Sequence, residues 1–378
     1  MEVSSTPLDG WCFKKRPEMR VLIVTGSFPP MKCGVGDYTY SLAKALAADP
    51  GMDVAVLTSL SGGKVPGIDV FPIVRDWSLF ELPRVVETIK KWAPDIIHVQ
   101  HPTQGYGKGY LPWLVPMIGF TMGKKVAQTW HELYRRHRLA RKLFLQAFVP
   151  GILVVVRPNY RESLPFLLRW AVWGKKFAFI RNASAIPKAE LSDFARDELR
   201  NQYLKGQKRL IVFFGFVHPV KGVELLFEIA DPCIDHIVIA GELSMAEGYS
   251  REIRTRAFSM PWDGKVTITG FLSPDNSASL LAVADAVILP FRLGGGEWNT
   301  SIHGAVLQGT FVVTASKSFN GYDEKHNVYY AQVDNVQEMK AALSTYAGRR
   351  RKCDPEMDES GWKEIANKHH SLYESLLS

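Results

Sequence analysis

The chain has 378 residues, of which 46% are hydrophobic and 22% charged, as in an ordinary globular protein long enough for two domains. No apolar run reaches the roughly 20 residues that a membrane span needs, and no apolar segment at the N-terminus has the form of a secretion signal. The four cysteines are widely spaced, so they support neither a disulfide framework nor a zinc site. We therefore expect a cytoplasmic protein without a structural metal.

The charge is distributed unevenly along the chain. The net charge is +8, but residues 1–186 hold 25 Lys and Arg against 13 Asp and Glu, whereas residues 187–378 hold 21 against 25. The first half is thus strongly basic and the second half mildly acidic. This asymmetry indicates that the two halves face different partners or surfaces.

Short apolar segments alternate with amphipathic helical segments along the whole chain. This alternation is typical of parallel sheets covered by helices on both faces. A polar stretch at 187–208 interrupts the pattern, which then starts again, so we expect two doubly wound α/β domains in series. The expected strands lie at 21–24, 54–57, 96–99, 126–129, 153–156, 210–214, 237–240, 266–269, 286–289 and 311–314.

The first loop, at 26–36, joins a strand to a helix, and we place Gly34 and Gly36 just ahead of that helix. Glycines let a ligand approach the backbone, and a helix N-terminus favours an anion. The spacing does not match the G-x-G-x-x-G pattern of dinucleotide-binding proteins, so a nicotinamide cofactor is disfavoured. A plain glycine-rich turn remains the alternative.

His131 follows the strand expected at 126–129, and His101 follows the strand at 96–99. Ligands of open α/β sheets bind beyond the carboxyl ends of the strands, so His131 occupies a position where catalytic groups are found. The alternative is a histidine that only caps a neighbouring helix.

The second half opens with a strand that ends at Phe214, followed by Gly215 and by Lys221-Gly222 ahead of a helix. An ammonium group beside a helix N-terminus suits a diphosphate, although a surface lysine has the same appearance in a sequence. No Asp-x-Asp pair occurs in the chain. We therefore expect no metal-chelated diphosphate, and no cofactor beyond the substrates.

A triple glycine, Gly294–Gly296, precedes Glu297 and a helix that starts near Asn299, Thr300 and Ser301. Strand, glycine-rich turn, helix and strand form the unit that presents backbone amides to a phosphate. The same residues are also default turn and cap residues, so this stretch alone does not decide between the two interpretations.

The order of these features resembles the GT-B fold retaining glycosyltransferases of family 4, over nearly the whole chain from Arg20 onward. The resemblance rests on the first glycine loop, a His after a middle strand, a G-x5-K-G segment and an acid before an A-x3-G-x2-V-V segment. It implies that Gly34 and Gly36 lie against the donor diphosphate and that His131 approaches the donor sugar. It also implies that Gly215, Lys221 and Gly222 bind the diphosphate.

Two positions depart from the family pattern. Phe216 stands where the family has a phosphate-binding Arg, for which Arg157, Arg181 and Arg292 are candidate substitutes. Gly304 stands where the second of two Glu residues binds the nucleotide ribose, and the first Glu position falls at Gly296, one residue before Glu297. Either other groups substitute, or donor binding differs from the family norm.

The resemblance implies a two-domain enzyme that transfers a sugar from a nucleotide-diphosphate-sugar donor to a hydroxyl acceptor, with retention of configuration and without a metal. The catalytic residues would be His131 and Glu297. The donor side would add Gly296 and the helix start at Asn299–Ser301. The expected layout is an N-terminal extension at 1–19, an acceptor domain at 20–186, a linker at 187–208, a donor domain at 209–358 and a C-terminal helix at 359–378 that crosses back to the first domain.

A basic segment in the first half carries Arg135, Arg136, Arg138, Arg141 and Lys142 on an expected amphipathic helix. Such a helix binds anionic membrane surfaces, and it is equally typical of a solvated helix that packs on a core. Because the resemblance implies glycan or lipid-linked acceptors, we favour peripheral binding at the inner face of the membrane. No nucleic-acid-binding motif is present.

Two other functions stay open. The altered glutamate pair and Phe216 are also compatible with a GT-B protein that binds a nucleotide sugar or a partner without turnover. A nucleotide-sugar epimerase is disfavoured, because the acidic catalytic groups that it needs cannot be placed.

Overall fold

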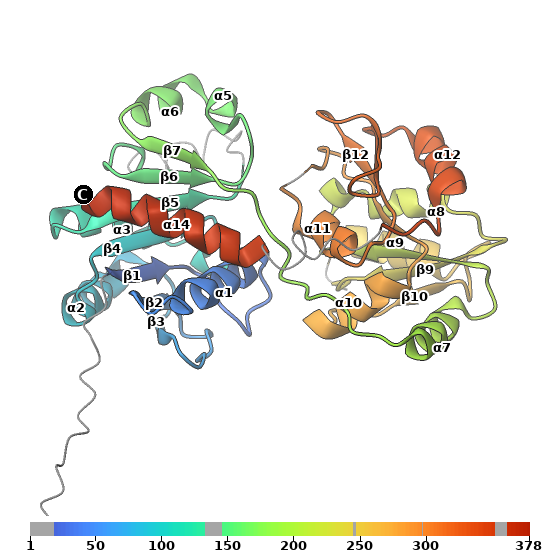
Figure 1. Ribbon diagram of the computed structural model, residues 1–378, viewed down its shortest axis with the longest axis horizontal. Coiled ribbons are helices and arrows are strands. Elements are labelled where there is room, and N and C mark those ends of the chain that lie inside the picture. Colours follow the sequence, from blue (N-terminus) through green and yellow to red (C-terminus); the bar gives the residue numbers. More distant parts are fainter. Residues whose placement is uncertain (1–18, 133–145, 245–246, 297, 352–360) are drawn as a thin grey trace, which may run out of the picture. The chain divides into compact units, whose positions relative to one another are not determined.

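The computed structural model describes residues 19–132, 146–244, 247–296, 298–351 and 361–378. These residues form two compact units (Figure 1). Unit 1 holds the described parts of Met1–Val154, Arg161–Ala178 and His369–Ser378, and unit 2 those of Val155–Tyr160 and Phe179–Lys368. Each unit contains one seven-stranded sheet with helices against it, so the α/β class predicted from the sequence is confirmed.

The sheet of unit 1 has the strand order β3-β2-β1-β4-β5-β6-β7. The central strand β1 is a continuous apolar run in which Val21 pairs in parallel with Val54 on one side and with Ile96 on the other. The chain order reverses between β1 and β4, which is the place where ligands of such sheets bind. The strands are β1 Met19–Val24, β2 Met52–Ser59, β3 Asp69–Val74, β4 Ile96–His101, β5 Lys125–Trp130, β6 Ile152–Val155 and β7 Lys176–Phe179.

The sheet of unit 2 repeats this order as β10-β9-β8-β11-β12-β14-β13. The reversal lies between β8 and β11, and β13 is antiparallel to β14 at the edge. The strands are β8 Arg209–Phe214, β9 Asp235–Ala240, β10 Val266–Ile268, β11 Ala286–Leu289, β12 Val312–Ser316, β13 Gly321–Asp323 and β14 Val328–Gln332.

Helices cover the sheets, and most of them bury an apolar face. In α1, for example, Tyr38, Leu42 and Leu46 are buried at helical spacing, whereas Gly34 and Asp37 are exposed. Unit 1 contains α1 Gly34–Ala47, α2 Leu82–Trp92, α3 Leu111–Thr121, α5 Tyr160–Ser163, α6 Phe166–Ala171 and the end of α14 Gly361–Leu377. Unit 2 contains α7 Asp193–Leu204, α8 Leu226–Ile229, α9 Gly248–Ala257, α10 Pro274–Val283, α11 Thr300–Leu307 and α12 Val336–Tyr346.

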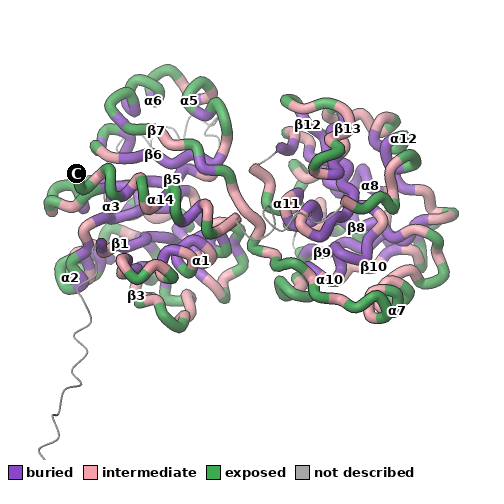
Figure 2. Tube along the Cα trace, viewed as in Figure 1, coloured by how far each residue is buried: buried purple, intermediate pink, exposed green. Residues whose placement is uncertain are grey.

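The central strands are almost fully buried, and each unit has its own apolar core between sheet and helices (Figure 2). Leu22 and Ile97 lie in the core of unit 1, and Val212 and Ile288 in that of unit 2. Among the described helices, none is long and apolar enough to cross a membrane.

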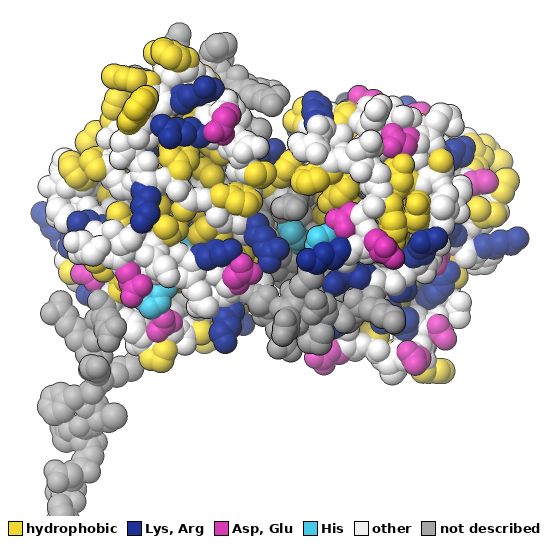
Figure 3. Space-filling model, turned by 45° about the horizontal axis from the view of Figure 1, so that its top comes forward, with side chains coloured by type: hydrophobic (Ala, Val, Ile, Leu, Met, Phe, Trp, Pro, Cys, Tyr) yellow, Lys and Arg dark blue, Asp and Glu magenta, His cyan; other side chains and the backbone are white. Residues whose placement is uncertain are grey.

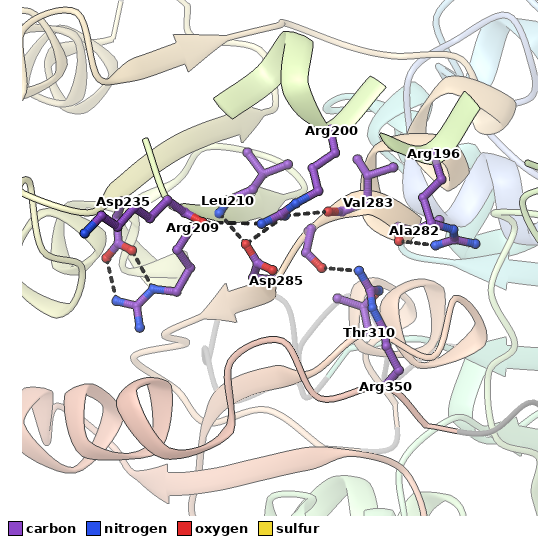
Figure 4. A network of polar contacts seen from close by, with 12 residues as sticks. Arg196, Arg200, Arg209, Leu210, Asp235, Ala282, Val283, Asp285, Thr310 and Arg350 are labelled. Atoms are coloured by element: carbon purple, nitrogen blue, oxygen red, sulfur yellow. Dashed lines mark hydrogen bonds and ion pairs between the residues drawn. The ribbon is translucent and has the colours of Figure 1, made fainter. Parts of the chain in front are cut away.

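Charged residues link the amino ends of neighbouring strands in unit 2 (Figure 4). Arg209, at the start of β8, binds Asp235, at the start of β9, through two hydrogen bonds of 2.5 and 2.8 Å. Asp285 precedes β11 and accepts from the Leu210 backbone amide at 2.7 Å and from Arg200 of α7 at 2.8 Å. Because these groups lie at the end of the sheet opposite the ligand edge, we assign them to stability rather than to chemistry.

Four strands were not predicted from the sequence, namely β3, β7, β13 and β14. Three of them, β3, β7 and β13, are partly exposed, and β3 carries Pro72 at the sheet edge. The strand β14 is more buried, but it ends in exposed Gln332. The sequence therefore predicted all the central strands, and the strands that it missed lie at an edge of a sheet or next to an edge strand.

Candidate functional site

The first glycine loop lies at the carboxyl end of β1, as predicted, but α1 begins earlier than the sequence indicated. Gly34 is the first helical residue and Gly36 lies in the first turn. A Cβ atom on Gly36 would come within 3.1 Å of the Ser27 carbonyl oxygen, whereas one on Gly34 would meet no atom within 4 Å. Gly36 therefore permits close packing of loop and helix, and Gly34 leaves the N-terminus of α1 open.

A second loop crosses the first at the reversal point of the sheet. A Cβ atom on Gly105, after β4, would lie 1.7 Å from the Gly26 carbonyl oxygen, so only glycine fits there. The Gly105 amide also donates to the Ser27 hydroxyl at 2.8 Å. Two loops from neighbouring strands are thus fixed against each other beside α1.

His131 follows β5 directly and is half-buried at the same edge. Its amide donates to the His101 carbonyl at 2.8 Å, and its ring lies edge-on to Tyr38 with 4.7 Å between centroids. Burial lowers the pKa of His131 to about 3, and the nearby His101 and His369 act in the same direction. The imidazole is therefore neutral at physiological pH, and it is suited to accept or donate a hydrogen bond rather than to carry a charge.

A buried hydrogen-bond chain holds the ring of His131. Its Nε2 lies 2.8 Å from Gln100 Oε1, and Gln100 Nε2 lies 3.2 Å from His98 Nε2. His98 Nδ1 lies 2.6 Å from the Tyr373 hydroxyl of α14. Because a carboxamide oxygen only accepts, His131 Nε2 carries the proton and Nδ1 is the free acceptor. The chain thus fixes both the tautomer and the orientation of His131.

In unit 2, the loop after β8 brings Lys221 to the carboxyl end of β11. Gly222 has a left-handed φ of 67°, and a Cβ atom there would lie 2.3 Å from the Pro290 carbonyl oxygen. The Arg292 amide donates to the Val220 carbonyl at 3.1 Å, which ties the two loops together. Lys221 Nζ lies 4.6 Å from the centroid of the Phe291 ring.

The triple-glycine turn, Gly294–Gly296, packs against the Phe291 ring. A Cβ atom on Gly295 would lie 2.7 Å from the Phe291 ring, and the Gly295 amide donates to the Ala315 carbonyl at 2.6 Å. Lys221 and Gly294 are 73 residues apart in the sequence. In the structure, Lys221 and the glycine turn both lie against the Phe291 ring. From the sequence we predicted only that both segments follow strands of one sheet, and not that they meet at Phe291.

The helix α11 starts as predicted, with Asn299 as its N-cap and Thr300 as its first residue. The Asn299 side chain does not cap the helix but accepts from the Gly296 amide at 2.9 Å, which closes the turn. Thr300 is exposed and Ser301 half-buried. Asn299 thus shapes the glycine turn and leaves the first amides of α11 to other partners. Glu297 lies outside the described residues.

The three candidate phosphate arginines have different surroundings. Arg292 is bound by Glu224 at 2.8 Å and by Asp334 at 2.6 Å, so two carboxylates already balance its charge. Arg181 pairs with Glu364 at 3.1 Å. Arg157 lies over the Trp298 ring, 5.1 Å from its centroid, next to the glycine turn. Of the three, Arg157 is therefore the one that the structure brings to the predicted phosphate turn.

The five basic residues expected to bind a membrane, Arg135, Arg136, Arg138, Arg141 and Lys142, lie outside the described residues. No group of three metal-ligating side chains gathers among the residues that are described.

Known proteins are similar to this chain both in sequence and in structure. The sequence model for Glycosyltransferase Family 4 matches residues 33–170, which include the first glycine loop and His131. This segment is therefore similar in sequence to the domains of that family. No curated protein matches the sequence.

Solved structures match nearly the whole chain. Sucrose-phosphate synthase from Thermosynechococcus elongatus has a TM-score of 0.71 at 16% identity and covers 95% of this chain and 99% of its own. HepE from Anabaena in complex with UDP-glucose has a TM-score of 0.68 at 16% identity and covers 95% and 98%. The catalytic domain of starch synthase IV from Arabidopsis thaliana, bound to ADP and acarbose, has a TM-score of 0.68 at 14% identity and covers 95% and 99%. The GT-B fold predicted from the sequence is therefore confirmed.

Gly304 and Phe216, the two positions predicted to depart from the family pattern, both lie in unit 2. A Cβ atom on Gly304 would lie 3.2 Å from the Ser184 hydroxyl and 3.5 Å from Ile186, so the segment before α7 occupies the space that a side chain would need. Phe216 is 38% exposed and packs edge-on against Phe271 with 5.4 Å between centroids. Position 304 is therefore closely packed against the segment before α7, and Phe216 forms an aromatic pair.

Two residues near the candidate site were missed in the sequence. Gln100 holds His131, and Asn182 donates to the Trp298 carbonyl at 3.0 Å. For Gln100 the local signal was the presence of His98, Gln100 and His101 in the buried strand β4, where polar side chains are unusual.

Proposed function

We propose that the chain transfers a sugar from a nucleotide-diphosphate-sugar donor to a hydroxyl group of a glycan or lipid-linked acceptor. The observation that carries this proposal is the meeting of Lys221 and the glycine turn at Phe291, with α11 starting directly after that turn. A cation, a backbone that a ligand can approach and a helix N-terminus are the elements that bind a diphosphate. The UDP-glucose and ADP named for two structures of the same fold support a donor of this class.

In this proposal the bond between the anomeric carbon and the diphosphate oxygen breaks, and the acceptor oxygen bonds to that carbon. The nucleoside diphosphate leaves with the electron pair, and its departing oxygen takes up the proton of the acceptor hydroxyl. Negative charge develops on the departing phosphate, where Lys221 and the amides of α11 stabilise it. Arg157 is the additional cation beside the turn.

His131 is the proposed catalytic group of unit 1. Its neutral ring has Nε2–H engaged by Gln100, which leaves Nδ1 to accept a hydrogen bond from a sugar hydroxyl. A hydrogen bond to a neutral, oriented ring positions the sugar without placing a positive charge beside the developing oxocarbenium character of a sugar carbon. Glu297 remains the proposed acidic partner on the donor side.

We further propose that the reaction is retaining, transfers a hexose and needs no metal, in line with the family resemblance and with the absence of an Asp-x-Asp pair from the sequence. The test is a thermal-shift panel of UDP, ADP and GDP, followed by detection of released nucleoside diphosphate with candidate acceptors in the presence and absence of EDTA. Activity that EDTA abolishes would refute metal independence, and an inverted product would refute retention.

Binding without turnover is the second candidate, favoured by the replacement of a side chain at Gly304 by packing and by Phe216. In that case one nucleotide would raise the melting temperature, while no acceptor would release nucleoside diphosphate from its sugar form.

A further inference from the structure

Unit 1 carries an unusual group of exposed apolar side chains on and after the short helix α6. Phe166 is 79% exposed, Leu167 64%, Trp170 59% and Trp173 75%. Leu168 and Ala171 on the same helix, and Val172 after it, are buried, so they supply the inward-facing contacts of the segment. The outer face of a helix at the surface of a globular protein is ordinarily polar. Here it is apolar, and we call Phe166, Leu167, Trp170 and Trp173 the aromatic patch.

The aromatic patch is continuous with neighbouring rings and cations. The Trp170 ring lies edge-on to Phe148 with 5.6 Å between centroids. The Arg161 guanidinium lies 5.9 Å from the centroid of Trp173 and 5.6 Å from that of Phe177. Figure 3 shows hydrophobic side chains with Lys and Arg among them over this part of unit 1, where α5 and α6 lie beside the edge strand β7 in Figure 1.

The exposed charges on and next to the patch are mostly positive. Arg161, Arg169 and Lys176 are exposed, and Glu162 is the single acid in the sequence between residues 146 and 178. A positively charged surface attracts an anionic partner. A symmetric dimer formed through the patch would place the same cations opposite one another, so the charges disfavour a second copy of the chain.

We propose that the aromatic patch inserts into the headgroup region of an anionic lipid membrane, with Arg161, Arg169 and Lys176 contacting the lipid phosphates. Trp and Phe side chains favour the boundary between headgroups and acyl chains, where an apolar ring is buried and a polar edge stays hydrated. Lysine and arginine beside such rings add attraction to acidic lipids. The proposal concerns membrane binding and does not depend on the transfer reaction.

The first experiment measures sedimentation of the full chain with phosphatidylcholine vesicles that contain or lack 30% phosphatidylglycerol. The double variant Phe166→Ser/Leu167→Ser removes the most accessible apolar atoms of the helix without touching its buried side. Phe80→Ser is the matched control, because Phe80 is 94% exposed elsewhere in unit 1. We expect binding to the anionic vesicles that weakens at least tenfold in the double variant, weakens with added salt and is unchanged in the control.

The second experiment uses lipids brominated along the acyl chain, which quench tryptophan fluorescence on contact. Anionic brominated vesicles should quench the tryptophan fluorescence of the wild-type protein. The variant Trp170→Phe/Trp173→Phe should lose most of that quenching while it still sediments with the vesicles. Equal thermal unfolding of all variants shows that they are folded.

Three results would overturn the proposal. These are wild-type protein that does not bind anionic vesicles, a serine double variant that binds as well as wild type, and quenching that survives the removal of both tryptophans. If the double variant instead converted a dimer to a monomer in the absence of lipid, the patch would be an interface between copies of the chain.

Discussion

At the scale of single residues, the orientation of His131 depends on Gln100. Replacing Gln100 by Leu removes the acceptor of the His131 Nε2 proton and the donor to His98. A buried donor left without a partner costs about 1–3 kcal/mol, and a loss of this size in the transition state alone slows turnover by roughly five- to a hundredfold. We therefore predict that Gln100→Leu lowers kcat by at least about fivefold and leaves the Kd for the nucleoside diphosphate unchanged.

The control for this prediction is Gln337→Leu, a glutamine exposed on α12. Equal activity of Gln100→Leu and wild type would contradict the role of the hydrogen-bond chain. A parallel loss of nucleotide affinity would indicate a general structural defect.

The residue at 304 provides a second test. Because Ser184 and Ile186 fill the space next to the Gly304 Cα, introducing a glutamate forces the segment before α7 to move. Overpacking of this kind costs about 1–3 kcal/mol. Gly304→Glu should therefore lower the free energy of unfolding and should not increase donor affinity. A stable Gly304→Glu variant that binds donor more tightly would show that the site only lacks the family carboxylate.

At the scale of elements, the two sheets are fastened in the same way at their amino ends. In unit 1, Asp95 before β4 accepts from the Arg20 amide of β1 at 2.8 Å, as Asp285 before β11 accepts from the Leu210 amide of β8 at 2.7 Å. In each unit, an arginine at the start of the central strand also pairs with an aspartate of the neighbouring strand, Asp53 or Asp235.

This arrangement predicts that Asp285→Ala destabilises unit 2 without changing its chemistry. The variant leaves the buried Leu210 amide without its acceptor and removes the carboxylate partner of Arg200, which costs about 2–4 kcal/mol for a mostly buried group. Denaturant unfolding should show the loss, whereas nucleotide affinity of the folded protein should stay the same. Asp263→Ala, at an exposed position, is the control. Weaker nucleotide binding by folded Asp285→Ala would contradict the division between the two ends of the sheet.

Local sequence signals determined how much of these elements was predictable. Continuous apolar runs such as Val21–Val24 and Ala286–Leu289 identify central strands, and topology then places the following Gly215 or His131 at the ligand edge. Contacts between distant residues have no such signal. The pairs His131 with Gln100 and Arg157 with Trp298, and the carboxylates around Arg292, depend on side-chain directions that periodicity does not specify.

At the scale of the whole molecule, buried histidines make stability depend on pH. His98 and His101 are fully buried; burial lowers the pKa of His101 to about 3 and holds that of His98 well below its usual value. In the unfolded chain both bind protons near pH 6.5. Their contribution to stability is therefore fully present above pH 6.5 and is lost as the pH falls from there toward 3.

We predict that the free energy of unfolding falls as the pH drops below 6, by up to about 1.4 kcal/mol per pH unit for each histidine with a strongly lowered pKa, His131 and His236 included. Denaturant titrations at pH 7.5, 6 and 5 measure this slope. His101→Phe, which keeps a ring stacked on Trp113, should reduce the slope by up to about 1.4 kcal/mol per pH unit. An unchanged slope in that variant would show that other groups control the acid response.

The account as a whole depends on a diphosphate site around Lys221. Calorimetric titration of the protein with UDP, ADP and GDP tests it most directly, with Lys221→Met as the variant and Lys340→Met, exposed on α12, as the control. A charge-assisted contact contributes about 1.5–3 kcal/mol, so Lys221→Met should weaken binding of the preferred diphosphate by roughly 10- to 150-fold while the control binds as wild type. If no diphosphate binds, or if Lys221→Met binds it as tightly as wild type, the proposed donor site is wrong.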